Sequence, residues 1–301
     1  MNGKRLVERA SALSEARSFF DSRGYIEVET PLLVPSPALD VHLDAFAVEE
    51  RYLSTSPEYQ MKRLLGAGAK RIFQISKAFR RNERGTRHNP EFTILEFYRA
   101  HASVHAIMRD TEQLVAKITK GEVVIDNQTF DLKPPFDRIT VCDAFERYAG
   151  WPREKTLHAA THDEDSFYLT LVDTVEPRLR EHPRAIFVTD YPIAQASLAR
   201  KNPTDPEVAE RFELYVAGVE LCNGFGELVD PGEQHARLVR DQDERKARGL
   251  PVYPIDHAFL NALRSGLPEC AGNAIGFDRL VAIANHTADI RATISFMDDE
   301  L

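Results

Sequence analysis

The sequence predicts an α+β protein, and three observations carry that prediction. Apolar side chains recur at helical spacing over residues 4–23. Two segments, 72–98 and 212–229, each hold two runs of strand-forming residues around a loop or turn, which is the pattern of an antiparallel hairpin. A strand that leads directly into a helix spans residues 272–284.

The N-terminal part is predicted to contain two helices with a strand between them. The helix at 4–23 ends before Gly24, a residue typical of helix C-caps. Residues 25–31 alternate in polarity up to a proline, so we predict a short strand there. Ser56 and Pro57 fit the N-cap and the first position of the second helix.

The predicted hairpin at 72–98 contains several candidate site residues, in its loop and on one face of its second strand. Its loop carries Arg80 and Glu83, together with the pair His88 and Asn89. In its second strand the alternation of side chains directs Glu96 and Tyr98, with Phe92, to the same face. This arrangement is typical of a site that holds a nucleotide at one end and a cationic amino acid at the other.

The middle of the chain offers fewer candidates. Residues 102–118 are predicted to be helical, and a polar connection follows. A helical insertion with little recognisable chemistry is expected at about 139–185. A buried strand at 185–191 precedes the hairpin at 212–229.

The second hairpin is predicted to turn at Ala217 and Gly218. Residue 213 then opposes residue 222, and Glu213 and Glu220 become diagonal neighbours about 7 Å apart. Two such carboxylates can hold Mg²⁺, which in turn binds nucleotide phosphates. The alternative is a pair of acids that face solvent.

Two further segments favour a ligand close to the backbone. Residues 221–227 combine two glycines with Asn223 and Glu227, which is a poor composition for a core strand. Residues 272–280 place small side chains at every other position, so that a flat group can lie against the strand. Arg279 emerges at the start of the following helix.

Bulk composition excludes several classes of protein. The 301 residues carry a formal net charge of −9, which argues against a surface that covers a tRNA or duplex backbone. The three cysteines lie far apart, so neither zinc nor a disulfide framework is indicated. No signal peptide or membrane-spanning run is recognisable, and a cytoplasmic location is expected.

Four segments together resemble the lysyl branch of the class II aminoacyl-tRNA synthetases: 55–65, 79–98, 212–230 and 266–283. The resemblance implies one catalytic domain over 1–301, an antiparallel sheet flanked by helices, and no anticodon-binding domain. It also implies a homodimer formed through the first helix and strand. Within that branch, Ala274 and the run from Gln195 to Ala199 are similar to stand-alone paralogues that modify elongation factor P.

The resemblance also implies roles for single residues. Arg80 would bridge the substrate carboxylate and the α-phosphate of ATP, although the spacing leaves Arg81 open as an alternative. The expected ATP-binding residues are Arg80, Glu83, His88, Asn89, Phe92, Glu213, Glu220 and Arg279, with Glu213 and Glu220 as ligands of Mg²⁺. The expected substrate-binding residues are Glu58, Glu96, Tyr98, Asn223, Phe225, Glu227 and Ala274.

The predicted function is ATP-dependent activation of lysine, specifically (R)-β-lysine, and its transfer to a lysine of elongation factor P. Glu96 and Glu227 support a lysine-like substrate, because ionised acids are costly to bury unless a cation pairs with them. One alternative is an enzyme of the same chemistry that charges tRNA or another acceptor. The other is a non-catalytic sensor of lysine, although the arginines and acids expected to bind ATP and Mg²⁺ are all present.

Overall fold

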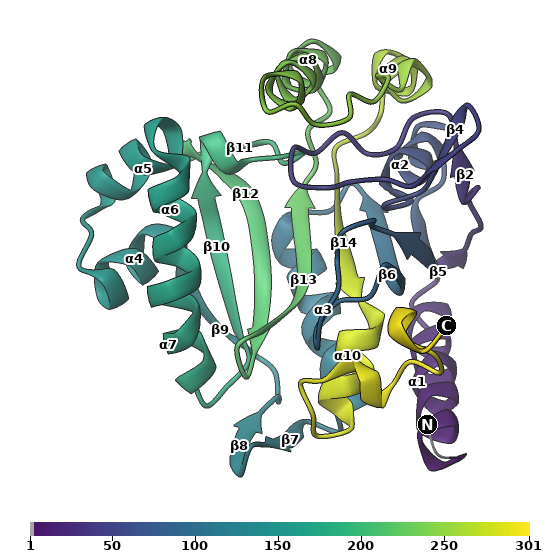
Figure 1. Ribbon diagram of the computed structural model, residues 1–301, viewed down its shortest axis with the longest axis vertical. Helices are drawn as coiled ribbons and strands as arrows, with labels where there is room; N and C mark the ends of the chain where they lie inside the picture. Colours follow the sequence, from purple (N-terminus) through teal and green to yellow (C-terminus); the bar gives the residue numbers. More distant parts are fainter. Residues whose placement is uncertain (1–2) are drawn as a thin grey trace.

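A computed structural model describes residues 3–301 and contains a central sheet flanked by helices (Figure 1). The sheet order is β1-β5-β6-β14-β13-β12-β10-β9, with β11 paired to β12. Pairing is antiparallel except for β1 with β5 and β9 with β10. Its strands are β1 (Ile26–Glu27), β5 (Arg71–Phe79), β6 (Glu91–Ala100), β9 (Asp137–Thr140), β10 (Ile186–Pro192), β11 (Lys201–Asn202), β12 (Asp205–Val216), β13 (Val219–Gly226) and β14 (Cys270–Gly276).

Helices surround this sheet on both faces. They are α1 (Gly3–Asp21), α2 (Glu58–Gly66), α3 (Val104–Thr119), α4 (Val141–Ala149), α5 (Arg153–His162), α6 (Glu164–Thr170), α7 (Glu176–Glu181), α8 (Pro231–Ala247), α9 (His257–Arg264) and α10 (Phe277–Ala284). Two small sheets are formed by β2 (Leu33–Val34), β3 (Ala47–Val48) and β4 (Arg51–Leu53), and by β7 (Glu122–Ile125) with β8 (Gln128–Asp131).

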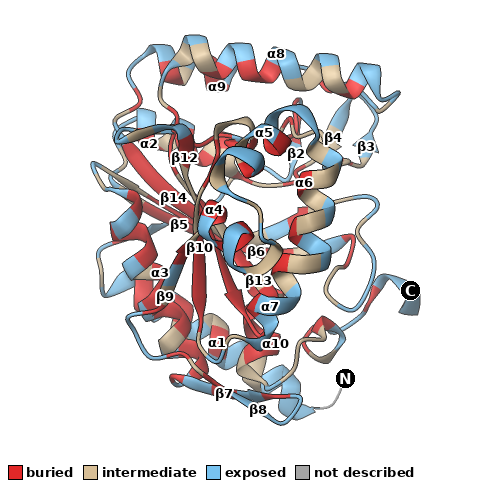
Figure 2. Ribbon diagram, turned by 90° about the vertical axis from the view of Figure 1, so that its left-hand side faces the viewer, coloured by how far each residue is buried: buried red, intermediate tan, exposed pale blue. Residues whose placement is uncertain are grey.

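One face of the sheet packs against α1, α3 and α10 to form the largest apolar core. Phe20 of α1 is fully buried and stacks on Phe73 of β5, with ring centroids 4.5 Å apart. Leu95 and Phe97 of β6 contribute to the same core. Figure 2 shows the strands buried along much of their length, while the helices expose their outer sides.

The opposite face is covered in two separate places. Helices α2 and α9 pack over the β6 end, where Tyr59 stacks on Phe259 with centroids 4.5 Å apart. Helices α4, α6 and α7 pack over β10, with Phe145 and Phe167 in their core. Between these two helical groups, this face of the sheet carries the polar side chains predicted to form the site.

The predicted elements are largely confirmed, with two corrections. The second helix begins at Glu58, because Pro57 occupies the N-cap position; the Ser56 hydroxyl still accepts the Glu58 N–H at 3.1 Å. The hairpin turns at Ala217 and Gly218 as predicted, but a bulge beside Tyr215 shifts the register. Residue 213 therefore opposes 223 and not 222.

Candidate active site

The strand register aligns five polar or small residues in one row across the sheet. Gln74 pairs with Glu96, Glu96 with Ala274, Ala274 with Asn223, and Asn223 with Glu213. Cross-strand partners point to the same face of a sheet, so these side chains share one surface. Residues far apart in the sequence are thus brought into one line.

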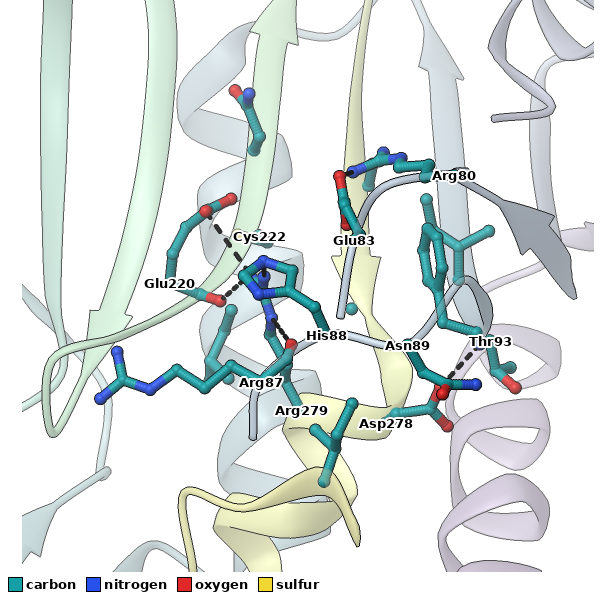
Figure 3. A pocket seen from close by; sticks show the side chains of 17 residues that line it. Arg80, Glu83, Arg87, His88, Asn89, Thr93, Glu220, Cys222, Asp278 and Arg279 are labelled. Carbon is teal, nitrogen blue, oxygen red and sulfur yellow. Dashed lines mark hydrogen bonds and ion pairs between the residues drawn. The ribbon is translucent and has the colours of Figure 1, made fainter. Parts of the chain in front are cut away.

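One end of this surface opens into a cavity of about 240 Å³ between β6, β13, the 80–89 loop and the start of α10 (Figure 3). Of the residues predicted to bind ATP, Glu213 is the one that does not line the cavity. Arg80, Glu83, His88, Asn89, Phe92, Glu220 and Arg279 all do. Asn223 and Ala274 also lie in its wall, on the side that faces the predicted substrate residues.

Arg279 is held at the cavity wall by Glu220, by His88 and by the Arg87 carbonyl, which accepts from its Nε at 3.2 Å (Figure 3). Its guanidinium donates to the Glu220 carbonyl at 2.8 Å, lies 3.5 Å from the Glu220 carboxylate, and contacts His88 Nε2 at 2.7 Å. Burial and the charge of Arg279 lower the pKa of His88, so the imidazole is neutral and can accept this bond. The cavity therefore contains a fixed positive charge.

The loop places Arg80 and Arg81 in different surroundings. The Arg80 guanidinium lies 5.0 Å from the centre of the Phe92 ring and 3.4 Å from Glu83. The Arg81 side chain is 48% exposed and lies 3.6 Å from Asp44, outside the cavity. Of the two possible registers, the geometry therefore favours Arg80.

Asn89 has its polar atoms engaged within the protein. Its Nδ2 donates to the Glu91 carbonyl at 2.7 Å, and its Oδ1 accepts the Asp298 N–H at 3.0 Å. The side chain therefore fastens the 80–89 loop to the C-terminal segment, in addition to lining the cavity.

The predicted substrate acids form a buried cluster next to the cavity. Glu96 and Glu227 are both 0% exposed, so the alternative in which they stand at exposed strand ends is wrong. Glu96 accepts hydrogen bonds from Ser56 at 2.6 Å and from Tyr98 at 2.9 Å. Phe225 packs beside this cluster, in the core formed with α2 and α9.

A lysine lies inside this cluster. The Lys62 ammonium lies 2.6 Å from Glu58 and forms a second ion pair with Glu227. Burial acts to lower the pKa of Lys62, but Glu227 and Glu58 raise it overall, so the ammonium stays charged. Lys62 is 0% exposed.

Burial makes the acids of the cluster costly to ionise, and a cationic partner would offset that cost. Burial, with Glu58 beside it, raises the pKa of Glu96 to about 7. Burial also raises the pKa of Glu227, although Lys62 opposes that shift. Several buried acceptors here have no hydrogen-bond partner, among them Glu227 Oε1, Asn223 Oδ1 and Gln74 Oε1. Such atoms are expected to pair with donors of a bound molecule.

Glu213 and Glu220 differ in how they could hold a metal ion. Partial burial and the nearby Glu213 raise the pKa of Glu220, which lies in the cavity wall. Glu213 is engaged by Arg211 at 2.7 Å and by the Tyr215 hydroxyl at 2.8 Å. Mg²⁺ usually binds through one or two carboxylates and substrate phosphates, so Glu220 fits that role directly. Glu213 fits it only by sharing its oxygens with these donors.

The glycines of β13 and β14 make room for other side chains of the protein, whereas the sequence predicted that they make room for a ligand. A Cβ at Gly224 would lie 2.3 Å from the Phe212 ring, and one at Gly272 would lie 2.2 Å from the Tyr98 ring. A Cβ at Gly226 would lie 2.1 Å from Glu210. The inference that a ligand approaches these strands was therefore wrong for these three positions, because the protein's own side chains fill the space.

The sequence did not point to Lys62, Gln74 or Glu176. Lys62 lies one helical turn after Glu58, a spacing that could have indicated the pair. Gln74 becomes a site residue only through its register with Glu96. Glu176 comes from the insertion and lies 3.3 Å from the Tyr215 hydroxyl, where burial and Glu213 raise its pKa to about 7.

Comparison with known proteins identifies the family. Residues 2–300 match the family model described as "tRNA synthetases class II (D, K and N)". The chain belongs to this family. The predicted α+β fold and the resemblance to the class II synthetases are therefore confirmed, and membership makes the chain an enzyme of the ligase class.

Curated relatives of this class II chain are named "Elongation factor P--(R)-beta-lysine ligase". The relative from Haemophilus influenzae (strain PittGG) is 40% identical over 322 residues, covering 98% of this chain and 95% of the relative. The one from Salmonella dublin is 39% identical over 310 residues with the same coverage. Within residues 3–301, no helix combines the length and apolar composition needed to cross a bilayer.

Proposed function

We propose that this chain activates a lysine-like diamino acid, (R)-β-lysine above all, with ATP and transfers it to a lysine side chain of elongation factor P. The observation that carries the proposal is the buried acid cluster beside a cavity lined by arginines. Glu58, Glu96 and Glu227 would receive ammonium groups, while Arg80 and Arg279 would receive phosphates. The names of the curated relatives support the same substrate and acceptor.

In the first step the carboxylate of the amino acid attacks the α-phosphorus of ATP, and pyrophosphate leaves. The carboxylate is already ionised at neutral pH, so no general base is needed. The protein contributes position and positive charge. Arg80 lies between Phe92 and Glu83, where it would contact both reacting groups, and Arg279 would hold the outer phosphate.

Mg²⁺ would be held by Glu220 with Glu213, together with the phosphates. When bound, it neutralises phosphate charge and helps to orient the leaving group. The Arg211 and Tyr215 contacts of Glu213 keep that carboxylate in place beside Glu220. The aromatic ring of Phe92 would stack on the adenine ring.

In the second step the neutral ε-amine of an acceptor lysine attacks the carbonyl of the adenylate. The new amide bond forms, AMP leaves with the electrons of the broken C–O bond, and the amine proton passes to water. The side chain of Ala274 lies between Asn223 and Glu96 in the row. Its methyl group would restrict where the substrate's amino-bearing carbon can lie.

A homodimer is part of the proposal. Apolar side chains are exposed on the first elements of the chain, with Leu6 at 50%, Val7 at 69%, Ile26 at 62% and Leu33 at 41% exposure. Contiguous exposed apolar side chains are typical of a protein interface, and the resemblance to the class II synthetases implies a dimer through these elements. Sedimentation of the parent and of Val7→Glu would test it, with a dimer expected for the parent and a monomer for the variant.

Two assays test the function. ATP–pyrophosphate exchange that depends on lysine or (R)-β-lysine is expected for the parent, and its absence would favour a non-catalytic sensor. Labelled amino acid is then offered with elongation factor P or with tRNA. Label on elongation factor P supports the proposal, whereas label on tRNA alone would overturn it.

A further inference from the structure

Lys62 has a place in the site that the predicted roles do not explain. It is a fully buried lysine whose ammonium contacts two of the three acids proposed to receive the substrate. A buried charge is normally retained only where partners compensate its desolvation. Apolar packing would fill the same space at a lower desolvation cost, so the charge itself requires an explanation.

We propose that Lys62 is a positioning residue that sets both the geometry and the net charge of the amino-acid pocket. This inference rests on the proposed function. The Lys62 ammonium holds Glu58 and Glu227 from one side, which fixes the direction of both carboxylates. It also cancels one of the negative charges that they bring together with Glu96.

The contacts with Lys62 leave one oxygen each on Glu227 and Glu58 that can meet a ligand. One oxygen of Glu227 faces Lys62, while its Oε1 is buried without a hydrogen-bond partner. Glu58 contacts Lys62 through Oε1, and its side chain remains 12% exposed. The ammonium therefore occupies one side of the pair and does not block the other.

The charge count matches a diamino acid. When a bound cation favours ionisation of all three acids, the acids and Lys62 together carry two uncompensated negative charges, and lysine or β-lysine brings two ammonium groups. An amino acid with an uncharged side chain would leave one buried carboxylate without a partner, which is costly. The pocket thus selects for the number of positive charges as well as for shape.

Further titratable groups lie near Lys62 and its acids. Tyr98 of β6 donates to Glu96, and burial with that carboxylate raises the pKa of the phenol. Cys270 of β14 has its pKa raised by burial and by Glu227. Both groups stay neutral near pH 7. Burial raises the pKa of Glu96 overall, although the charge of Arg80 lowers it and so favours the ionised form.

Steady-state ATP–pyrophosphate exchange on the full chain tests the inference. For Lys62→Met we expect KM for lysine to rise by about tenfold or more, with KM for ATP nearly unchanged. The pH profile of kcat/KM for lysine is expected to move upward by about one unit, because the remaining acids lose their internal cation. Arg63→Met removes a charge from the exposed neighbour on the same helix and should leave both values unchanged.

A parental KM and pH profile for Lys62→Met would overturn the inference, as would equal losses for lysine and ATP, which indicate a general structural effect. If that variant does not fold, Lys62→Arg carries the test. It keeps the charge and alters the geometry, so KM for lysine should rise while the pH profile stays in place; any other pattern overturns the inference. Absence of exchange in the parent would instead refute the proposed function.

Discussion

The cavity and the acid cluster are the two halves of the site, and they differ in how far their charged side chains are exposed to solvent. In the cavity, Arg279 and Glu220 are partly exposed, with side chains 20% and 39% accessible. In the acid cluster, Lys62 and Glu227 are 0% and 1% accessible. The cavity can be entered by a large polyanion with water still present, whereas the cluster is preorganised around an internal cation. Nucleotide binding is thus expected to depend on charge, and amino-acid binding on charge and exact fit.

The largest expected effect concerns stability in the buried half. Glu227→Ala leaves Lys62 buried with Glu58 as its remaining partner, and should lower the free energy of unfolding by about 3–5 kcal/mol. Urea denaturation measures it. Glu91→Ala removes an exposed pair with Lys77 and should change stability by about 0.5 kcal/mol or less. Equal effects of the two substitutions would contradict the difference between the halves.

In the cavity the expected loss is catalytic. Arg80→Ala should lower the rate of adenylate formation about 100-fold or more, equivalent to about 3 kcal/mol of transition-state stabilisation. Its thermal stability should stay near parental, because the side chain is only partly buried. Arg81→Ala is the matched control and should retain activity. A parental rate for Arg80→Ala would refute the role of the arginine.

Changing pH should affect the two halves unequally. The pKa of Glu96 is raised to about 7, so raising the pH from 6 to 8.5 ionises it and should lower KM for lysine about tenfold. KM for ATP should change less. The sign for stability is opposite: a raised folded-state pKa stabilises the empty protein at low pH, and this contribution is lost as pH rises through 7. Melting temperatures with and without lysine would show both trends.

The smallest expected effect is on specificity. Ala274→Gly removes one methyl group from the row, and should shift the ratio of kcat/KM for lysine and (R)-β-lysine about tenfold toward lysine. Competition assays with both amino acids give this ratio. KM for ATP serves as the internal control, because Ala274 lies on the substrate side of the cavity. An unchanged ratio would show that the methyl group does not discriminate.

Sequence reasoning reached the α+β fold and most of the residues that line the cavity. Local patterns placed Arg80 and His88 in the loop and Glu96 on the strand that follows it, and the resemblance to the class II synthetases supplied the roles of the remaining residues. It failed where two strands meet. The bulge beside Tyr215 changes the partner of Glu213, and no local pattern marks a bulge of this kind.

Burial was the other property that the sequence could not supply. Lys62 follows Glu58 by one turn, like many exposed helix pairs, and only packing against Phe259 and Glu227 removes it from solvent. Glu176 was overlooked for a related reason. Its helix lies in an insertion without motifs, and the three-dimensional fold brings it to Tyr215.

The row of side chains from Gln74 to Glu213 also sets a fixed distance within the site. Neighbouring strands are about 4.8 Å apart, so the backbone positions of Glu96 and Glu213, on β6 and β12, are separated by about 14 Å. Backbone hydrogen bonds between the strands hold this spacing, so it does not depend on which side chains form the row. The amino acid and ATP together must therefore span a set length, from the ammonium group at Glu96 to the phosphates and Mg²⁺ near Glu213. A shorter homologue of lysine would not reach the acid cluster and the α-phosphate at the same time.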